Sequence, residues 1–214
     1  MADVEALKRA AAERAAALVE DGMRVGLGTG TTVAPLLELL GTRGLRLSCV
    51  ATSLATETAA REAGLDVRPF DEVPELDIAI DGADQIGPGP WLVKGGGRAH
   101  TREKVVAAAA ARFVVIASDN KRVDRIRAPV PVELLAFGAA ATLARLEHVE
   151  LRGGAPTPDG GLVADWTGPV GDPAELALHL AAEPGVVEHG LFAPELVSDV
   201  IVAGERGVEH RTLR

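Results

Sequence analysis

Short apolar runs alternate with helical patterns over the first part of the chain. Helical spacing of apolar residues predicts helices at 3–20, 32–40, 54–63 and 99–111. The apolar runs predict strands at Met23–Leu27, Leu45–Ala51, Leu76–Ile80, Trp91–Val93 and Phe113–Ala117. Continuously apolar strands that alternate with helices are typical of a parallel sheet covered on both faces. The pattern predicts an α/β domain whose ligand lies at the carboxyl ends of the strands.

The pattern changes from residue 128 onward. Helices are expected at 137–147 and 172–183, and strands at Val130–Leu134, Val149–Arg152, Leu162–Asp165 and Val186–Leu191. This order is the split βαβ pattern of a small α+β domain. Asp199–Ala203 then predicts a buried strand that returns to the first sheet. We therefore expect residues 1–127 and 199–214 to form the large domain and 128–198 the small one.

The net charge indicates which partners are expected, and the cysteine content indicates the cell compartment. The formal net charge of -9 argues against nucleic acid or an acidic membrane as a partner, although a local basic pocket can still hold a small phosphorylated substrate. Cys49 is the only cysteine, so no intramolecular disulfide can form and a reducing compartment is expected. Neither a signal peptide nor a membrane-length apolar stretch is recognised, which predicts a cytoplasmic, soluble protein.

The first loop with candidate chemistry joins the predicted strand Met23–Leu27 to the next helix. It reads Gly-Leu-Gly-Thr-Gly-Thr-Thr from Gly26 to Thr32. Glycines allow the backbone to approach an anion, and a helix N-terminus and threonine hydroxyls supply donors. A dinucleotide site is disfavoured, because Thr31 replaces the third glycine and the next strand lacks the acid that holds a ribose. The loop predicts a phosphate-binding turn, with a purely structural turn as the alternative.

Two further loops place charges and glycines at strand ends. Asp81-Gly82-Ala83-Asp84 directly follows a buried run. Its two carboxylates can bind sugar hydroxyls together, or they can simply cap backbone N–H groups of a turn. Lys94 is followed by Gly95-Gly96-Gly97, and a glycine run is costly to order, which indicates close backbone approach to a ligand. The Lys94 ammonium can there face an oxyanion.

Single residues elsewhere are ambiguous by themselves. Glu103 lies in the first turn of a predicted helix, where an acid is also favourable without any catalytic role. Lys121 lies in a polar turn and can be merely solvated. His100 is expected to be exposed and incidental. The five histidines show no ligand spacing, so no metal site is expected.

Taken together, these segments resemble the A-type ribose-5-phosphate isomerase family. The matching stretches are GLGTGTT, ATSLATE, DIAIDGADQI, VKGGGRAHTREKVV, SDNKRVD, PVPVE and PGVVEHGLF, in order over essentially the whole chain. The resemblance implies a Rossmann-like domain joined to a smaller ferredoxin-like α+β domain, a homodimer or homotetramer, and no cofactor. It also implies interconversion of D-ribose 5-phosphate and D-ribulose 5-phosphate through an enediolate, in the non-oxidative pentose phosphate pathway.

The resemblance assigns roles to particular residues. Glu103 would be the base that moves the proton, with Asp81, Asp84 and Lys94 as further catalytic residues. The segments 81–84 and 94–97 would line the sugar site, through Asp81, Gly82, Ala83, Asp84, Lys94, Gly95, Gly96 and Gly97. The phosphate would be held by Thr29, Gly30, Thr31, Thr32, Lys121 and Lys8. Arg98, His100 and Gln85 depart from the usual family pattern, but no matched catalytic position is lost.

Two alternatives come from other functional classes. A phosphosugar-sensing regulatory domain would normally be fused to a DNA-binding helix-turn-helix, whereas here the first strand is expected by residue 23 and the net charge is -9. A dinucleotide-dependent oxidoreductase is disfavoured by Thr31 and the missing acid. Turnover of ribose 5-phosphate without added nucleotide would separate the isomerase from both.

Overall fold

The computed structural model describes residues 3–214, which form two compact units. The first unit comprises the residues up to Ala83, Arg102–Lys121 and Glu195–Arg214. The second comprises Asp84–Thr101 and Arg122–Pro194. The second segment of the first unit thus ends at Lys121 rather than at residue 127, and residues 84–101 group with the smaller unit.

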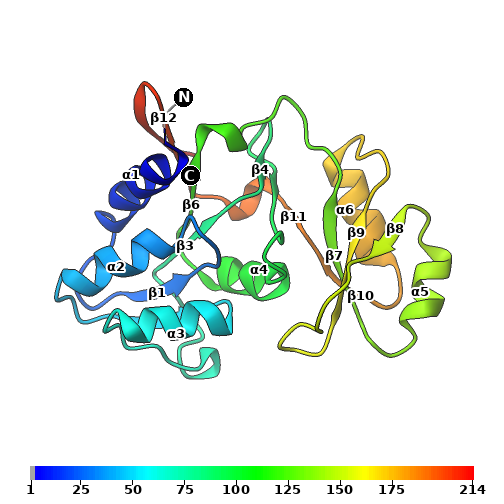
Figure 1. Ribbon diagram of the computed structural model, residues 1–214, viewed down its shortest axis with the longest axis horizontal. Coiled ribbons are helices and arrows are strands. Elements are labelled where there is room, and N and C mark those ends of the chain that lie inside the picture. The colour runs from blue at the N-terminus through cyan, green and yellow to red at the C-terminus, as the bar shows by residue number, and fades with distance from the viewer. Residues whose placement is uncertain (1–2) are drawn as a thin grey trace. The chain divides into compact units, whose positions relative to one another are not determined.

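The first unit is built on a six-stranded sheet with the strand order β13-β12-β6-β3-β1-β2 (Figure 1). All pairings among β1, β2, β3, β6 and β12 are parallel, whereas β13 pairs antiparallel with β12. The strands are β1 (Arg24–Leu27), β2 (Ser48–Ala51), β3 (Ile78–Gly82), β6 (Phe113–Ser118), β12 (Asp199–Gly204) and β13 (Gly207–Thr212). The predicted return of the last buried strand to the first sheet is confirmed by the pairing of β12 with β6.

Helices cover both faces of this sheet, as predicted. Apolar residues of α1 (Val4–Ala16), α2 (Ala34–Thr42) and α3 (Leu54–Glu62) pack in one core cluster with alternate residues of β1 and β3, among them Leu27 and Ile80. The intervening residue Gly26 faces α4 (His100–Ala109), where an added Cβ would lie 2.5 Å from Val106 Cγ1. Because alternate strand residues point to opposite faces, α4 covers the face opposite to the other three helices.

The second unit contains a four-stranded antiparallel sheet with the order β10-β7-β9-β8. With its two helices it follows the predicted split βαβ pattern, which in chain order gives the ferredoxin-like arrangement. The elements are β7 (Val130–Leu134), α5 (Ala139–Arg145), β8 (Val149–Leu151), β9 (Leu162–Trp166), α6 (Pro173–Ala182) and β10 (Val186–His189). A three-stranded antiparallel sheet in the same unit joins β4 (Gln85–Ile86), β5 (Leu92–Val93) and β11 (Leu191–Phe192).

Some predicted elements differ from the structure for identifiable reasons. The run Trp91–Val93 does not join the parallel sheet, because β5 pairs antiparallel with β4 and β11 instead. The single strand predicted at Val186–Leu191 is two strands, interrupted at Gly190, whose N–H donates to Pro131 O. The first helix ends at Ala16 rather than at residue 20, and β4 and β13 were not predicted. Short polar strands such as β13 carry no apolar run, so their pairing is visible only in the tertiary structure.

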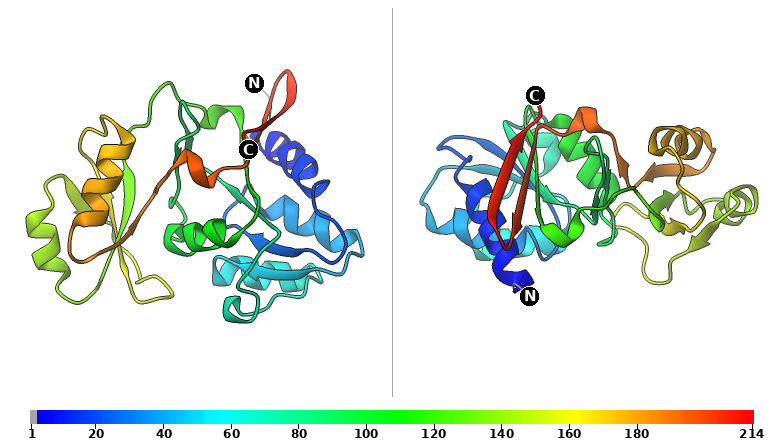
Figure 2. Two further views of the ribbon diagram at one scale, coloured as in Figure 1. Left: turned by 180° about the vertical axis from the view of Figure 1, so that it is seen from behind. Right: turned by 90° about the horizontal axis from the view of Figure 1, so that it is seen from above.

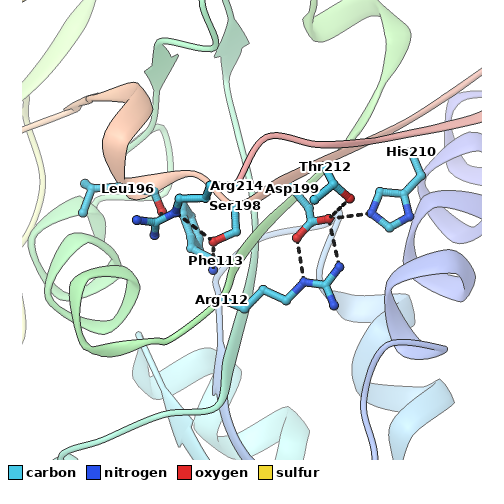
Figure 3. Close-up of polar contacts among 8 residues, drawn as sticks. All are labelled: Arg112, Phe113, Leu196, Ser198, Asp199, His210, Thr212 and Arg214. Atoms are coloured by element: carbon cyan, nitrogen blue, oxygen red, sulfur yellow. Dashed lines mark hydrogen bonds and ion pairs between the residues drawn. The ribbon is translucent and has the colours of Figure 1, made fainter.

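A buried carboxylate anchors the C-terminal hairpin of β12 and β13, which lies beside α1 (Figure 2). The Asp199 side chain is fully buried and accepts hydrogen bonds from Arg112 Nε at 2.6 Å and Nη2 at 2.9 Å (Figure 3). His210 Nε2 and Thr212 Oγ1 each donate to the same carboxylate at 2.8 Å.

Within residues 3–214, no helix has the length and apolar character needed to cross a membrane.

Candidate active site

The turn after β1 combines a left-handed glycine with a helix N-terminus. Gly30 has φ +110°, and its carbonyl oxygen accepts bonds from Val33 N at 3.0 Å and Ala34 N at 3.2 Å. The N–H groups of residues 30–32 therefore precede the first donor of the helical turn, where backbone donors have no partner within the helix. Lys8 Nζ donates to Thr31 Oγ1 at 2.9 Å and forms an ion pair with Glu5 at 2.6 Å, so a paired cation lies at the same turn. This arrangement is suited to binding an anion.

A layer of buried hydroxyls from the next strand end supports this turn. Thr29 Oγ1 lies 2.8 Å from Thr52 Oγ1 and 3.2 Å from Thr56 Oγ1. Thr52 donates to Leu27 O at 3.2 Å, and Thr56 donates to Gly28 O at 2.9 Å. Because each hydroxyl has a single proton, Thr29 must donate to one of the two threonines. The Thr29 hydroxyl therefore holds the turn in place rather than supplying a free donor.

Asp81 lies under the same turn, at the end of β3. Its side chain is buried, and its Oδ1 accepts bonds from Thr29 N at 3.1 Å and Gly82 N at 2.7 Å. Gly28 passes so close that an added Cβ would lie 2.0 Å from the Asp81 carboxyl carbon. The glycine is thus required because only a hydrogen fits there. The sequence motif predicted a ligand-binding or a capping role for Asp81, and the structure shows that its carboxylate caps this turn.

Helix α4 runs antiparallel to β3, which fixes the level of each helical turn against the sheet. Near the start of β3, Leu76 N donates to Ala109 O at 3.1 Å. One turn earlier along α4, Val106 reaches the position above Gly26, whose added Cβ would also lie 2.9 Å from Ala79 Cβ. Moving from Ala109 to Val106 along the helix therefore corresponds to moving from Leu76 to Ala79 along the strand.

The same correspondence places Glu103 near the level of Asp81. Glu103 lies a further turn toward the N-terminus of α4, a rise of about 4.5 Å. Asp81 lies two residues beyond Ala79 on the same sheet face, an advance of about 6.6 Å. The Glu103 side chain is only 4% exposed, which is unusual for an acid whose sole role is to favour a helix terminus. The structure thus brings both carboxylates to the carboxyl edge of the sheet.

Lys121 lies at that edge too, in the short turn after β6. It ends the 3-10 helix Asp119–Lys121, and its side chain is half-buried. Because β6 is parallel to β3, both strands end at the same side of the sheet. Lys121 therefore follows the strand neighbouring the one that carries Asp81.

Within the second unit, Asp84 and the glycine run contact each other directly. Gly96 N donates to Asp84 Oδ2 at 2.7 Å, and Asp84 N donates to Val93 O at 2.8 Å. Gly95 has φ +104°, which a side chain rarely adopts. The Lys94 side chain is 2% exposed, and its Nζ lies 5.4 Å from the centre of the Phe192 ring. A burial this deep is rare for a lysine.

His100 differs from its predicted environment. It was expected to be exposed, but its exposed fraction is 0%. A Cβ added to Gly95 would lie 2.7 Å from His100 Nδ1, so the imidazole packs against the glycine run. The sequence could not show this, because the environment of a helix-start side chain depends on the loop that folds over it.

Several of the residues described within each unit were missed or only weakly indicated by the sequence. Thr52 and Thr56 lie within the matching stretch ATSLATE and follow a strand end, which was the available signal. Lys8 was implied only by the resemblance, and the structure places it at Thr31. Arg152 donates to Gly95 O at 3.1 Å, and nothing in the sequence indicated that contact. Among residues 3–214, no group of three or more His, Cys, Asp or Glu side chains has the geometry to hold a metal ion.

Comparisons of the sequence and of the structure with known proteins point to the same family. Residues 48–207 match the family model described as ribose 5-phosphate isomerase A (phosphoriboisomerase A). Ribose-5-phosphate isomerase A of Methylorubrum extorquens is 44% identical, over 93% of each chain. The crystal structure of ribose 5 phosphate isomerase A from Neisseria gonorrhoeae has a TM-score of 0.93 at 33% identity, covering 99% of this chain and 98% of that one. A D-ribose-5-phosphate isomerase in complex with phospho-erythronic acid also has a TM-score of 0.93 at 33% identity, covering 99% of this chain and 100% of that one.

Proposed function

The chain belongs to the ribose 5-phosphate isomerase A family and interconverts ribose 5-phosphate and ribulose 5-phosphate, and we propose that Glu103 carries the proton in this reaction. The observation that carries the proposal is the burial of Glu103 at the carboxyl edge of the sheet, near the level of Asp81. A carboxylate held out of water at the edge where ligands bind is suited to act as a general base.

The proposed reaction is a proton shift between two adjacent carbons. Glu103 takes the proton from C2 of the open-chain aldose, and the electron pair moves to the carbonyl oxygen to give an enediolate. The same carboxyl group returns the proton to C1, while the hydroxyl proton at O2 moves to O1, so that the ketose forms without a net change in atoms or electrons. Because the substrate proton is weakly acidic, the base needs a partner that stabilises the enediolate.

We assign this stabilisation to the loop that begins at Lys94. A buried ammonium and the backbone N–H groups of Gly95 and Gly97 supply positive charge and donors for an oxyanion, while the Gly96 N–H donates to Asp84. Asp81 and Asp84 would repel that anion if they faced it as free carboxylates, so they are assigned to sugar hydroxyls, with Gly82 and Ala83 beside them. The bonds from Thr29 N and Gly82 N to Asp81 support a fixed carboxylate of this kind.

The phosphate is assigned to the turn Thr29–Thr32. The N–H groups of Gly30, Thr31 and Thr32 and the hydroxyls of Thr31 and Thr32 supply donors, and Thr29 holds the turn. Lys8, which contacts Thr31, and Lys121 supply positive charge. The related structure in complex with phospho-erythronic acid, a phosphorylated sugar acid, supports a site of this chemistry. Binding energy from the phosphate, remote from the reacting carbons, helps to hold the open form of the sugar.

The decisive test is Glu103→Gln, which keeps the shape of the side chain but cannot accept the proton. Turnover should fall by at least ~10²–10⁴, the usual contribution of a positioned base, with little change in folding or KM. Exchange of solvent deuterium into the substrate at the carbon next to the carbonyl should disappear in parallel.

Glu175→Gln is the matched control, since Glu175 is an acid in the first turn of α6. If first-turn charge were all that mattered, both variants would lose a little stability and keep their activity. Retention of turnover by Glu103→Gln would therefore remove the proposed base.

We further propose a homodimer or homotetramer that acts in the cytoplasm. Large apolar side chains remain exposed in the second unit, with Phe137 at 88% and Leu178 at 73%, which supports a protein contact there. Cys49 is buried, and burial, with a smaller effect of Asp66, raises the pKa of its thiol to about 12, which disfavours the reactive thiolate at neutral pH. Light scattering on the purified protein would measure the assembly directly, and a monomer at micromolar concentration would contradict it.

A further inference from the structure

The Gly95–Gly97 loop is closed by a turn bond from Arg98 N to Gly95 O at 3.0 Å, and its three glycines need further restraint to hold one conformation. Glycine loses more conformational freedom on ordering than any other residue. Three in succession therefore favour many loop conformations over the one that aims its N–H groups. Two arginines outside the site assigned above restrain it: Arg152 contacts the loop carbonyl groups, and Arg98, which follows the loop in the chain, ties its end to Gly153 and Ala155.

Arg152 binds the carbonyl side of the loop. Its Nη1 donates to Gly95 O at 3.1 Å and, at a longer 3.4 Å, to Gly96 O. The remainder of the guanidinium forms an ion pair with Asp165, in which Nε donates to Oδ2 at 2.9 Å and Nη2 donates to Oδ1. Because Arg152 N also donates to Val163 O, the arginine is fixed to the four-stranded sheet at both its backbone and its side chain.

Arg98 fixes the far end of the loop. Its guanidinium donates to Gly153 O at 2.8 Å and to Ala155 O at 2.6 Å. Its own backbone is left-handed, with φ 64°, a conformation that disfavours a residue with a Cβ. The backbone strain is thus retained at a position where the side chain makes two hydrogen bonds.

Carbonyl anchoring determines where the N–H groups point. In a trans peptide, the C=O of one residue and the N–H of the next point in opposite directions. Gly95 O faces Arg152, and the following N–H, that of Gly96, donates to Asp84 on the other side at 2.7 Å. By the same geometry, the contact of Gly96 O with Arg152 turns the Gly97 N–H away from the arginine.

We propose that Arg152 and Arg98 are positioning residues that fix the backbone of the Gly95–Gly97 loop, so that the Gly97 N–H points toward the enediolate oxygen while the Gly96 N–H stays on Asp84. The inference rests on the proposed role of this loop in stabilising the enediolate. Their effect is therefore on the transition state, because the enediolate charge develops only during the reaction. The cation at the carbonyl oxygens also polarises the peptide groups and strengthens their N–H donors.

The test is Arg152→Met, which keeps the aliphatic stem and removes the guanidinium. We expect kcat to fall about 10- to 100-fold, with KM within about threefold of wild type, as for a small misplacement of a catalytic group. Arg152→Lys should recover part of kcat, because an ammonium can still reach a carbonyl. Hydrogen–deuterium exchange of the peptide containing residues 94–98 should accelerate in Arg152→Met.

Arg145→Met is the matched control. Arg145 also combines an ion pair, to Glu183 at 2.5 Å, with a bond to a backbone carbonyl, Pro184 O at 2.8 Å, but it does not serve the glycine loop. Its removal should change stability alone and leave kcat and exchange at 94–98 unchanged. If Arg152→Met does not fold, Arg98→Asn serves as the second variant, since asparagine tolerates the left-handed backbone better than most residues and lacks the guanidinium that binds Gly153 O and Ala155 O.

Three outcomes would overturn the proposal. These are wild-type kcat in the folded variants, unchanged exchange at 94–98, or a rise in KM without a fall in kcat. Glu103→Gln measured in parallel separates this inference from the proposed function. An inactive Glu103→Gln beside a fully active Arg152→Met refutes the arginine positioning alone.

Discussion

Replacing Asp199 with Asn should destabilise the fold without affecting the chemistry. Burial alone would raise the pKa of this carboxyl group, but hydrogen bonds from Arg112, His210 and Thr212 outweigh it and lower the pKa from 3.8 to about 2. The difference corresponds to about 2 kcal/mol of stability at neutral pH. Asn keeps the shape but loses the charge and turns an NH₂ donor toward donors. For a chain of this size, a loss of about 2 kcal/mol lowers Tm by about 4–8 °C.

The stability contributed by the Asp199 carboxylate should decrease at low pH. The folded-state pKa of Asp199 is depressed, so its stabilisation is present above the unfolded-state pKa of about 3.9 and is lost as pH falls toward 2. The difference in unfolding free energy between wild type and Asp199→Asn should therefore shrink as the pH falls below about 4. The steepest slope expected from one group is about 1.4 kcal/mol per pH unit.

Thermal and urea unfolding followed by circular dichroism would measure both effects. Asp77→Asn is the control, because Asp77 also binds an arginine, Arg24, but its side chain is 37% exposed, and solvent weakens such a pair. It should lose less stability than Asp199→Asn. The folded Asp199→Asn enzyme should keep its kcat, since Asp199 begins β12 at the sheet edge opposite to Lys121. An unchanged Tm at pH 7, or a difference that persists undiminished at pH 3, would refute the reasoning.

Three further outcomes are expected. Lys121→Ala should mainly raise KM for ribose 5-phosphate, by removing a charge-assisted contact of roughly 1.5–3 kcal/mol, and equal turnover of unphosphorylated ribose by wild type would contradict a phosphate site. Thr56→Val removes the hydroxyl that donates to Gly28 O, so KM should rise several-fold, whereas Thr56→Ser should stay near wild type. Equal KM values for the Val and Ser variants would argue against the hydroxyl layer. Exhaustive chelation should leave turnover unchanged, and activity lost to a chelator and restored by a divalent ion would contradict a metal-free mechanism.

The fold class of the chain, and the loops that carry candidate chemistry, could be predicted from the sequence. Continuous apolar runs such as Phe113–Ala117 can be buried on both faces only in a covered sheet, and the switch of pattern near residue 128 predicted the α+β part. Glycines and carboxylates at strand ends indicated the DGAD and KGGG segments, because ligands lie at the carboxyl ends of parallel strands, whereas Glu103 was indicated only by the resemblance to the family. These signals are local, so a one-dimensional pattern contains them.

Contacts between side chains that are far apart in the sequence could be seen only in the tertiary structure. The antiparallel course of α4 against β3 brings Glu103 near the level of Asp81, and no spacing in the sequence encodes that correspondence. The burial of His100 and the contact of Arg152 with Gly95 depend on loops that pack together from distant parts of the chain. The binding of an arginine to a backbone carbonyl cannot be predicted from the identity of the accepting residue, because every residue has a carbonyl oxygen. Such contacts become visible only when the chain is folded.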